Sequence, residues 1–311
     1  MIKYIIKRIL LIIPLILGVA IVIFTIMYFT PGDAARTMLS ASASEAQVEA
    51  LRESLGLNDP YLVQLGRFLK ELFLEFNVGV SYMNGTSVMG EIVSRLPRTI
   101  LLAGVCCLMQ VCIAIPLGIS AAFHQNKWQD AICTLVALIG ASIPGFWLAL
   151  MMILLFSNTL HWLPSFGIGS FAHWIMPCIA AGIECIGGIA RLTRSQMLEV
   201  IRSDYMCTAK AKGLPARKIK YRHALPNVLI PVVTAIGSYF GSSLGGTVVI
   251  ETAFSIPGVG LYMVDAIGNR DLPVIRGGVV VLAILFCFVI LLVDILYAFI
   301  DPRIRAQYEK R

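Results

Sequence analysis

The chain has 311 residues, of which 58% are hydrophobic and only 14% are charged. A soluble domain needs roughly 25% charged residues to cover its surface, so this composition indicates that lipid solvates much of the chain. The formal net charge of +7 would suit either nucleic acid or an anionic membrane surface, and the positions of the basic residues decide between the two.

The N-terminal segment is the first candidate for a membrane span. Lys3, Lys7 and Arg8 precede the apolar run 9–30, which matches the ~20 residues needed to cross a bilayer and exceeds the apolar core of a signal peptide. No small-residue cleavage site follows this run. We therefore expect an uncleaved transmembrane helix at 1–30.

The long segment 31–98 lacks an apolar run of spanning length. Residues 44–55 carry three glutamates at helical spacing, residues 61–76 are amphipathic, and Asn58-Asp59-Pro60 separates the two stretches. We expect this segment to form an extracytoplasmic helical cap rather than an independent domain.

Five further apolar stretches are close to spanning length: 99–123, 131–159, 173–190, 227–250 and 277–300. Each predicts a transmembrane helix, because a helix satisfies its own backbone hydrogen bonds in lipid. The expected fold class is all-α. It is a polytopic membrane protein with six transmembrane helices, a transmembrane domain at 99–300 and a tail at 301–311.

The distribution of basic residues predicts the orientation. Nine of them lie in the segment 191–222 and others lie near the N-terminus, at Lys127 and in the tail, whereas the short loops on the other side hold only Arg270 and Arg276. An excess of Lys and Arg marks the cytoplasmic side, which places both termini in the cytoplasm. Because topology accounts for the positive charge, nucleic acid is not an expected partner.

The cysteines and histidines show no metal-site pattern. Seven of the eight cysteines lie in apolar stretches, Cys207 lies in the basic segment, and none shares a ligand spacing with a histidine. His161 and His173, even combined with Glu184, have no established ligand spacing. We expect free thiols, and no metal or other cofactor bound by this chain.

The cytoplasmic segment 191–226 has the pattern of a helix, a turn and a second short helix. Side chains with apolar character recur at helical spacing, namely Met197, Val200, Ile201, Tyr205 and Thr208. Gly213 is a helix stop, and Leu214-Pro215 forces a turn from which a second helix runs to His223. An exposed apolar stripe between two spans favours the docking of a partner over a solvated linker.

This segment resembles the EAA loop of ABC importer permeases. Cys207-Thr208-Ala209, Gly213, His223 and Leu225-Pro226 follow the spacing of that motif, with Cys207 and His223 in place of its usual Glu and Ile. The resemblance implies a coupling helix near 198–213 within a coupling loop at 191–226. It assigns contact with an ATPase to these residues: Tyr205, Thr208, Ala209, Gly213, Leu225 and Pro226.

Four other stretches, 142–148, 251–260, 269–274 and 301–305, resemble the B-type permease of dipeptide, oligopeptide and nickel importers. The resemblance implies a type I ABC importer permease fold in the bacterial inner membrane, surrounded by membrane lipid. It also implies a second homologous permease subunit, two ABC ATPase subunits that bind ATP-Mg, and an extracytoplasmic solute-binding protein. Di- and oligopeptides are the expected substrates, with nickel or a metal chelate as the alternative.

Catalytic signatures are missing from the sequence. It contains no Gly-Lys pair for a P-loop, no Gly-x-Ser-x-Gly and no His-Glu-x-x-His. We therefore expect a transport subunit rather than an enzyme, with ATP hydrolysis in separate subunits. An ion-coupled secondary transporter is less favoured, because no inverted repeat is evident.

A few residues within the predicted spans are candidates for the transport pathway. Glu184 either lines the pathway or forms a structural pair, and Asp294 is expected to be structural. Pro144 and Gly145 interrupt the third span and indicate either a fixed kink or a gate. Four glycines in the fifth span predict close helix packing, within the chain or against the partner permease: Gly237, Gly241, Gly245 and Gly246.

Overall fold

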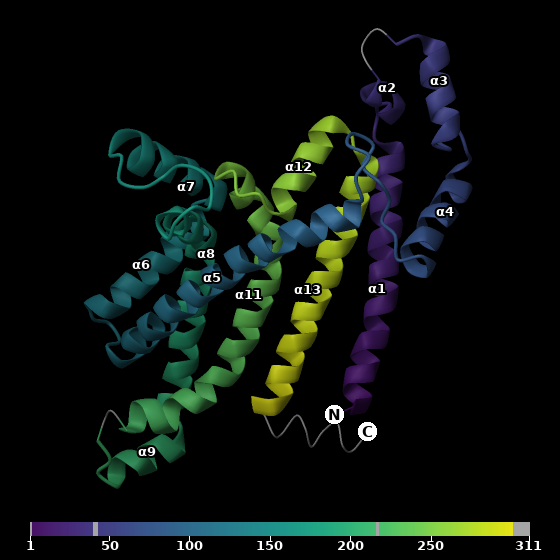
Figure 1. Ribbon diagram of the computed structural model, residues 1–311. Helices are drawn as coiled ribbons and strands as arrows, with labels where there is room; N and C mark the ends of the chain where they lie inside the picture. The colour runs from purple at the N-terminus through teal and green to yellow at the C-terminus, as the bar shows by residue number, and fades with distance from the viewer. Residues whose placement is uncertain (1, 40–42, 216–217, 301–311) are drawn as a thin grey trace. The chain divides into compact units, whose positions relative to one another are not determined.

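The computed structural model describes the backbone of residues 2–39, 43–215 and 218–300, without the side chains of 2–5, 7, 184, 210, 244, 294 and 296–300. Most of this part is helical (Figure 1), and its one β pairing is an isolated bridge between Val80 and Ser87. The helices are α1 (Ile2–Phe29), α2 (Ala34–Met38), α3 (Glu45–Ser54), α4 (Tyr61–Leu74), α5 (Val88–Phe123), α6 (Trp128–Ser142), α7 (Gly145–Met152), η1 (Ile153–Thr159), α8 (Ala172–Ile201), α9 (Asp204–Ala211), η2 (Ile219–Ala224), α11 (Leu225–Ala253), α12 (Val259–Asn269) and α13 (Leu272–Ile300).

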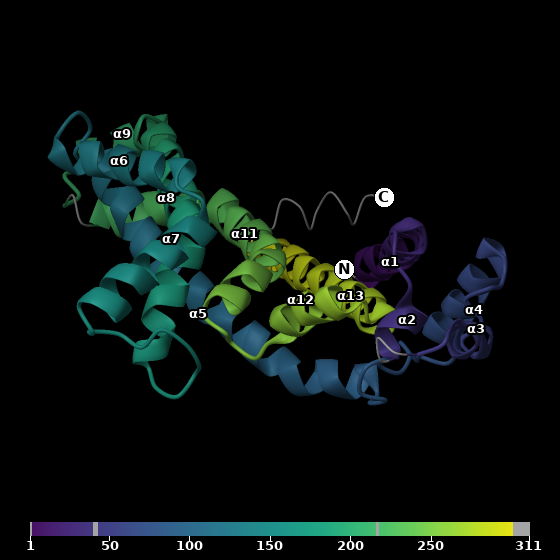
Figure 2. The ribbon, with the colours of Figure 1, turned by 90° about the horizontal axis from the view of Figure 1, so that it is seen from above.

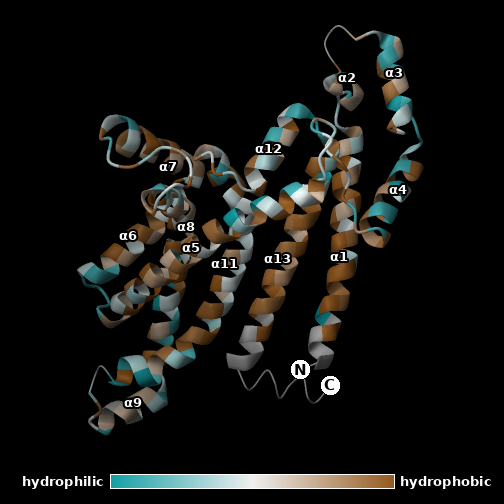
Figure 3. Ribbon diagram, viewed as in Figure 1, coloured by the Kyte–Doolittle hydropathy of each residue, from teal (hydrophilic) through white to brown (hydrophobic). Residues whose placement is uncertain are grey.

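The apolar helices account for the predicted spans. Within the described residues four helices are long and apolar enough to cross a membrane, and two bent pairs raise this to six if each pair is one span. The pairs are α6 with α7–η1, bent by 97°, and the two halves of α8, bent by 53°. These six elements coincide with the six apolar stretches of the sequence, and hydrophobic residues dominate α1 and α13 (Figure 3).

The break between α6 and α7 has a local cause. Ile143 has an extended backbone, Pro144 is the N-cap of α7, and the helix resumes at Gly145. A Cβ at Gly145 would lie 3.0 Å from the carbonyl oxygen of Ala180 in α8, so glycine permits this close approach. The predicted interruption of the third span is thus a sharp bend.

The chain divides into two compact units, and the first consists mainly of residues 100–256 with the end of α13. Its centre is α8, which contacts α6, α7, α9 and α11, and Figure 2 shows α6, α7 and α8 gathered together. Glycines set the spacing: a Cβ at Gly118 of α5 would lie 2.4 Å from the Ala190 carbonyl oxygen, and one at Gly187 of α8 would lie 2.7 Å from the Ala137 Cα. Backbones in this unit therefore meet without intervening side chains.

The second unit, which we call the cap unit, consists of residues 6–99 and 257–287. Its apolar core joins α1, α4, α12 and the first turns of α13 through Phe24, Phe68, Met263 and Val274. Residues 75–87 are fastened to α13, since buried Asp271 accepts hydrogen bonds from Ser81 Oγ (2.5 Å) and the Tyr82 backbone N–H (3.0 Å).

The helices predicted in segment 31–98 are present in this unit. Ser44 caps α3 in a capping box with Gln47, and Pro60 is the N-cap of α4. The prediction was wrong about where the next helix starts: α5 begins at Val88 rather than near residue 99. Its first turns are polar and are stabilised by the ion pair between Glu91 and Arg95, so hydropathy alone did not reveal them.

Candidate functional site

The site begins at the turn that joins α8 to α9. The Ser203 hydroxyl donates to the Val200 carbonyl oxygen (2.6 Å), and the Ser203 carbonyl oxygen accepts from the Met206 N–H (3.0 Å). These local bonds end one helix at Ile201 and start the next at Asp204. The prediction of one coupling helix near 198–213 was therefore wrong about its continuity, because Ser203 supplies local hydrogen bonds that replace the helical ladder.

The end of α9 follows the sequence prediction. The helix stops at Ala211, and Gly213 has a left-handed backbone with φ of 70°. Glycine adopts this conformation without the penalty that a Cβ imposes. Past residues 216–217, which lie outside the described residues, η2 leads directly into α11 with Pro226 in the first turn of α11.

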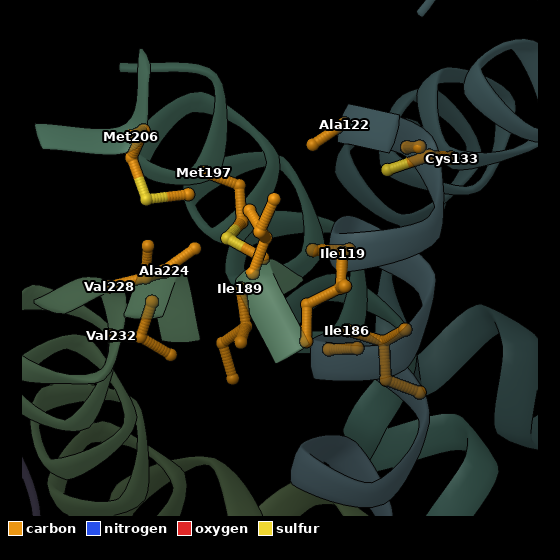
Figure 4. Packing of buried hydrophobic residues seen from close by; sticks show 14 of the residues in the cluster. Ile119, Ala122, Cys133, Ile186, Ile189, Met197, Met206, Ala224, Val228 and Val232 are labelled. Atoms are coloured by element: carbon orange, nitrogen blue, oxygen red, sulfur yellow. The ribbon is translucent and has the colours of Figure 1, made fainter. Parts of the chain in front are cut away.

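One face of α9 is part of the core of the α8-centred unit. Met206 is fully buried and belongs to the same cluster as Met197 of α8, Ala224 of η2 and Val228 of α11 (Figure 4). Ala209, predicted to contact an ATPase, also faces this cluster and is only 8% exposed. A force applied to α9 therefore reaches α8 and α11 through direct side-chain contact.

The opposite face is open and defines what we call the docking surface: Tyr205, Cys207, Thr208, Tyr221, Arg222 and Pro226. Tyr205 is 46% exposed and its hydroxyl accepts a hydrogen bond from Asn227 Nδ2 (3.0 Å), which ties α9 to the start of α11. An open hollow of about 670 Å³ is lined by Pro215, Lys218, Tyr221, Arg222 and Pro226. The structure thus places Tyr205 beside the start of α11 and leaves Thr208 and Pro226 exposed, whereas Leu225 is half-buried in the core.

The docking surface has basic surroundings. Arg202, Lys212, Lys218 and Arg222 are exposed on this segment. Lys220 is held differently, with Nζ 5.0 Å from the centroid of the Phe123 ring and 5.3 Å from that of Tyr221. An exposed surface with this charge is complementary to an acidic partner.

An ion pair near this end of α8 was missed by the sequence analysis. Arg194 holds Asp130 of α6 through two hydrogen bonds, Nη2 to Oδ2 (2.8 Å) and Nε to Oδ1, and the Asn126 N–H donates to Asp130 Oδ2 (3.0 Å). The fork of the guanidinium fixes the orientation of α6 on α8. Both residues were visible in the sequence as charges flanking apolar stretches, but they are 64 positions apart and nothing in the sequence signals a pair.

The remaining candidates lie elsewhere. Pro144 and Gly145 lie at the bend between α6 and α7, and the side chains of Glu184 and Asp294 lie outside the described residues. A Cβ at Gly237 would lie 2.3 Å from Val293 Cγ1, so this glycine packs within the chain, whereas Cβ atoms at Gly245 and Gly246 would meet nothing within 4 Å. In the described part, all eight cysteines are free thiols and no group of three or more His, Cys, Asp or Glu residues could hold a metal ion.

An all-α chain with several apolar spans and a basic docking segment has the features of a membrane transport component. The chain matches the family described as the binding-protein-dependent transport system inner membrane component over residues 114–306, and the N-terminal part of such components over residues 1–103. It belongs to this family, as the resemblance in the sequence predicted. It is accordingly a transport subunit and not itself an enzyme.

Similar proteins cover nearly the whole chain. The dipeptide transport system permease protein DppB of Alkalihalophilus pseudofirmus is 41% identical over 333 aligned positions, which cover 98% of this chain and 100% of the relative. The glutathione transport system permease protein GsiC of Salmonella paratyphi A is 39% identical over 306 positions, which cover 98% and 99%.

The fold also has a counterpart among solved structures. A chain of the MetNI methionine ABC transporter in inward-facing conformations matches with a TM-score of 0.57 and 19% identity, over 68% of this chain and 97% of that one. This similarity confirms the predicted permease fold.

Proposed function

We propose that the chain is the permease subunit of an ATP-driven importer that carries di- and oligopeptides across the bacterial inner membrane. The observation that carries this proposal is the 41% identity to a dipeptide permease over 98% of this chain and 100% of the relative. The other relative described above is a permease for glutathione, which favours peptides over the nickel alternative.

The proposed assembly contains a second homologous permease, two ATPase subunits that bind ATP-Mg, and an extracytoplasmic solute-binding protein. Both termini lie in the cytoplasm, on the side of the basic docking segment, while the cap at 31–98 lies outside. Pro144, Gly145 and Glu184 are candidates for the transport pathway.

The docking surface suggests how ATP-driven motion reaches the spans. The ATPase binds the exposed face around Tyr205, Thr208 and Tyr221, and its closure moves α9 as a rigid piece. Because Met206 lies in one core with residues of α8 and α11, both helices follow that movement. Tyr205 couples to α11 a second time through its hydrogen bond with Asn227.

The test is uptake of a labelled dipeptide by cells that lack the chain and are complemented with wild type or with Gly213→Val. A β-branched residue at φ of 70° costs about 1–2 kcal/mol or more and reorients the connection after α9. We expect uptake to fall about tenfold or more, while purified complexes still hydrolyse ATP but no longer respond to substrate.

Gly85→Val is the matched control. Gly85 also has a left-handed backbone (φ of 65°) and, like Gly213, its Cβ would meet nothing within 4 Å, but it lies in the cap unit. The Gly85→Val variant should retain near-normal dipeptide uptake when it is as abundant in the membrane as the wild type. Normal uptake by Gly213→Val would contradict the coupling role, and absence of dipeptide uptake in the wild type would contradict the substrate class.

A further inference from the structure

The cap unit contains a cavity of about 560 Å³ into which three arginines converge. Arg52 comes from α3, Arg270 is the C-cap of α12, and Arg276 comes from α13. The loop after α1, including Pro31, Gly32 and Asp33, forms part of the wall. A cavity of this size is within the ~300–1,000 Å³ range of ligand-binding pockets.

Only one of these three arginines has a carboxylate within 4.0 Å among the described residues. Arg52 Nη2 lies 2.6 Å from Asp33 Oδ2, and its Nη1 lies 2.9 Å from Glu49 Oε2. This arrangement satisfies both Arg52 and Asp33. Among the described residues Asp33 is also the only acidic one in the cavity lining, so no other carboxylate there is available to receive a cationic group.

Arg270 is exposed and is held in place without an ion pair. Its Nη1 donates to the Pro31 carbonyl oxygen (2.7 Å), and the guanidinium occupies the space that a Cβ on Gly32 would need. The residue itself has a left-handed backbone with φ of 56°, a conformation that a bulky side chain rarely adopts. Strained backbone of this kind is a recurrent feature of ligand-binding positions.

Arg276 is balanced by aromatic faces. Its guanidinium carbon lies 5.2 Å from the centroid of the Phe24 ring and 5.5 Å from that of Phe68, and Nε donates to the Leu272 carbonyl oxygen (3.3 Å). Tyr82 and Glu71 interact with it from the side of a neighbouring cavity. Aromatic faces orient a cation but leave its charge available to an incoming anion.

We propose that this arginine cavity receives an acidic side chain of the extracytoplasmic solute-binding protein, with Arg270 and Arg276 holding its carboxylate. The proposal rests on the proposed function, which supplies the binding protein and places the cap outside. The guanidinium groups of Arg270 and Arg276 attract a carboxylate, whereas a zwitterionic peptide would find no free carboxylate for its ammonium group among the described lining residues, because Asp33 is paired with Arg52.

The experiment is uptake of a labelled dipeptide by cells whose only copy of the chain carries Arg270→Glu, Arg270→Lys or Arg276→Gln. Reversing the charge of Arg270 should reduce uptake at limiting substrate about tenfold or more, and Arg270→Lys should retain most of it. Arg36→Glu is the matched control, because Arg36 lies in the same unit, is exposed and does not line the cavity. It should change uptake less than about twofold.

Selection then identifies the occupant. Arg270→Glu cells that regain growth on the dipeptide should carry Asp or Glu to Lys or Arg changes in the gene of the binding protein. If the mutations that restore growth were found only within this chain, the proposal would be overturned. An Arg270→Gln variant that alters the preference between a dipeptide and its C-terminal amide would also overturn it, since the cavity would then bind the substrate.

The two proposals fail in different ways. If wild-type cells import no dipeptide, the proposed function would be refuted, and the proposal for the arginine cavity would be refuted with it. If wild-type cells import the dipeptide and an equally abundant Arg270→Glu variant is equally active, only the proposal that the binding protein's acidic side chain enters the arginine cavity would be refuted.

Discussion

The α8-centred unit and the cap unit are held together by different kinds of contact. In the first, glycines let helix backbones touch, and the buried side chains next to the docking helix α9 are apolar. In the second, short helices and loops are fixed by carboxylates, such as Asp271 with Ser81 and Asp33 with Arg52. The difference follows from the solvent: lipid provides no hydrophobic driving force between apolar helices, so close packing and rare polar bonds hold them together. Helices in water are stabilised by their caps and, more modestly, by exposed ion pairs.

This comparison predicts that steric changes harm the first unit most and that changes of charge or pH act on the second. The Asp130–Arg194 pair departs from this pattern, as does the hydrogen bond between Asn227 and Tyr205, because both are polar bonds within the α8-centred unit.

The largest effect is expected from a single added methyl group at Gly118. Its Cβ would lie 2.4 Å from the Ala190 carbonyl oxygen, so Gly118→Ala forces α5 away from α8. We expect a loss of about 1–3 kcal/mol in stability, measured as a lower thermal unfolding temperature in detergent.

Gly104→Ala, on the same helix, is the control. A Cβ at Gly104 would meet nothing within 4 Å, so the change should be neutral or stabilise by up to about 1 kcal/mol. Equal behaviour of the two variants would show that α5 and α8 are not packed through Gly118.

A smaller effect is expected from Asp130→Asn. The substitution leaves Arg194, whose side chain is 27% exposed, without its charge partner beside a largely buried amide. Stability should fall by about 1–2 kcal/mol, less than for a fully buried pair because water still reaches the arginine.

A double-substitution cycle sharpens this prediction. Adding Arg194→Gln to Asp130→Asn should cost less than the sum of the two single changes. Arg191→Gln, one turn away and exposed, should have little effect. Full additivity would show that the pair does not join α6 to α8.

The smallest effect is expected from the pH dependence of the cap. The hydrogen bond from Arg52 lowers the pKa of the Asp33 carboxyl below its ordinary value of 3.8. Because the folded pKa is the lower one, the pair stabilises the cap fully above about pH 4, and this contribution is lost as the pH falls through the folded value.

Hydrogen exchange measures this local effect. The Ala35 amide donates to Asp33 Oδ1 (3.1 Å), so its protection, corrected for the intrinsic rate, should be constant from pH 7 to 4 and fall below that. Asp33→Asn should remove the dependence on pH. A decline that begins near pH 6 would point to a different group.

Much of the fold could be predicted from the sequence, because apolar runs and turn residues act locally. The six spans, the helical pattern of residues 44–55 and the stop at Gly213 all depend on neighbouring residues. The turn at Ser203 was missed because its hydrogen bonds compete with an equally good helical pattern.

Long-range contacts were beyond sequence reasoning. Ala209 faces the core rather than a partner, since its exposure is set by Met206 and by residues of η2 and α11. The Asp130–Arg194 pair and the cavity lined by Arg270 and Arg276 likewise join segments that are far apart in the chain. A single sequence gives no signal for such encounters.

The exposed position of Cys207 has a practical consequence. Cys106, Cys133, Cys178 and Cys287 are buried, Cys107 and Cys185 are half-buried in the apolar stretches of α5 and α8, and the other exposed thiol, Cys112, also lies within α5. A water-soluble maleimide dye should therefore label the natural chain selectively at Cys207, in the middle of the docking surface. The native protein thus carries its own attachment point for a fluorophore whose emission would report, in real time, the arrival and departure of whatever binds there.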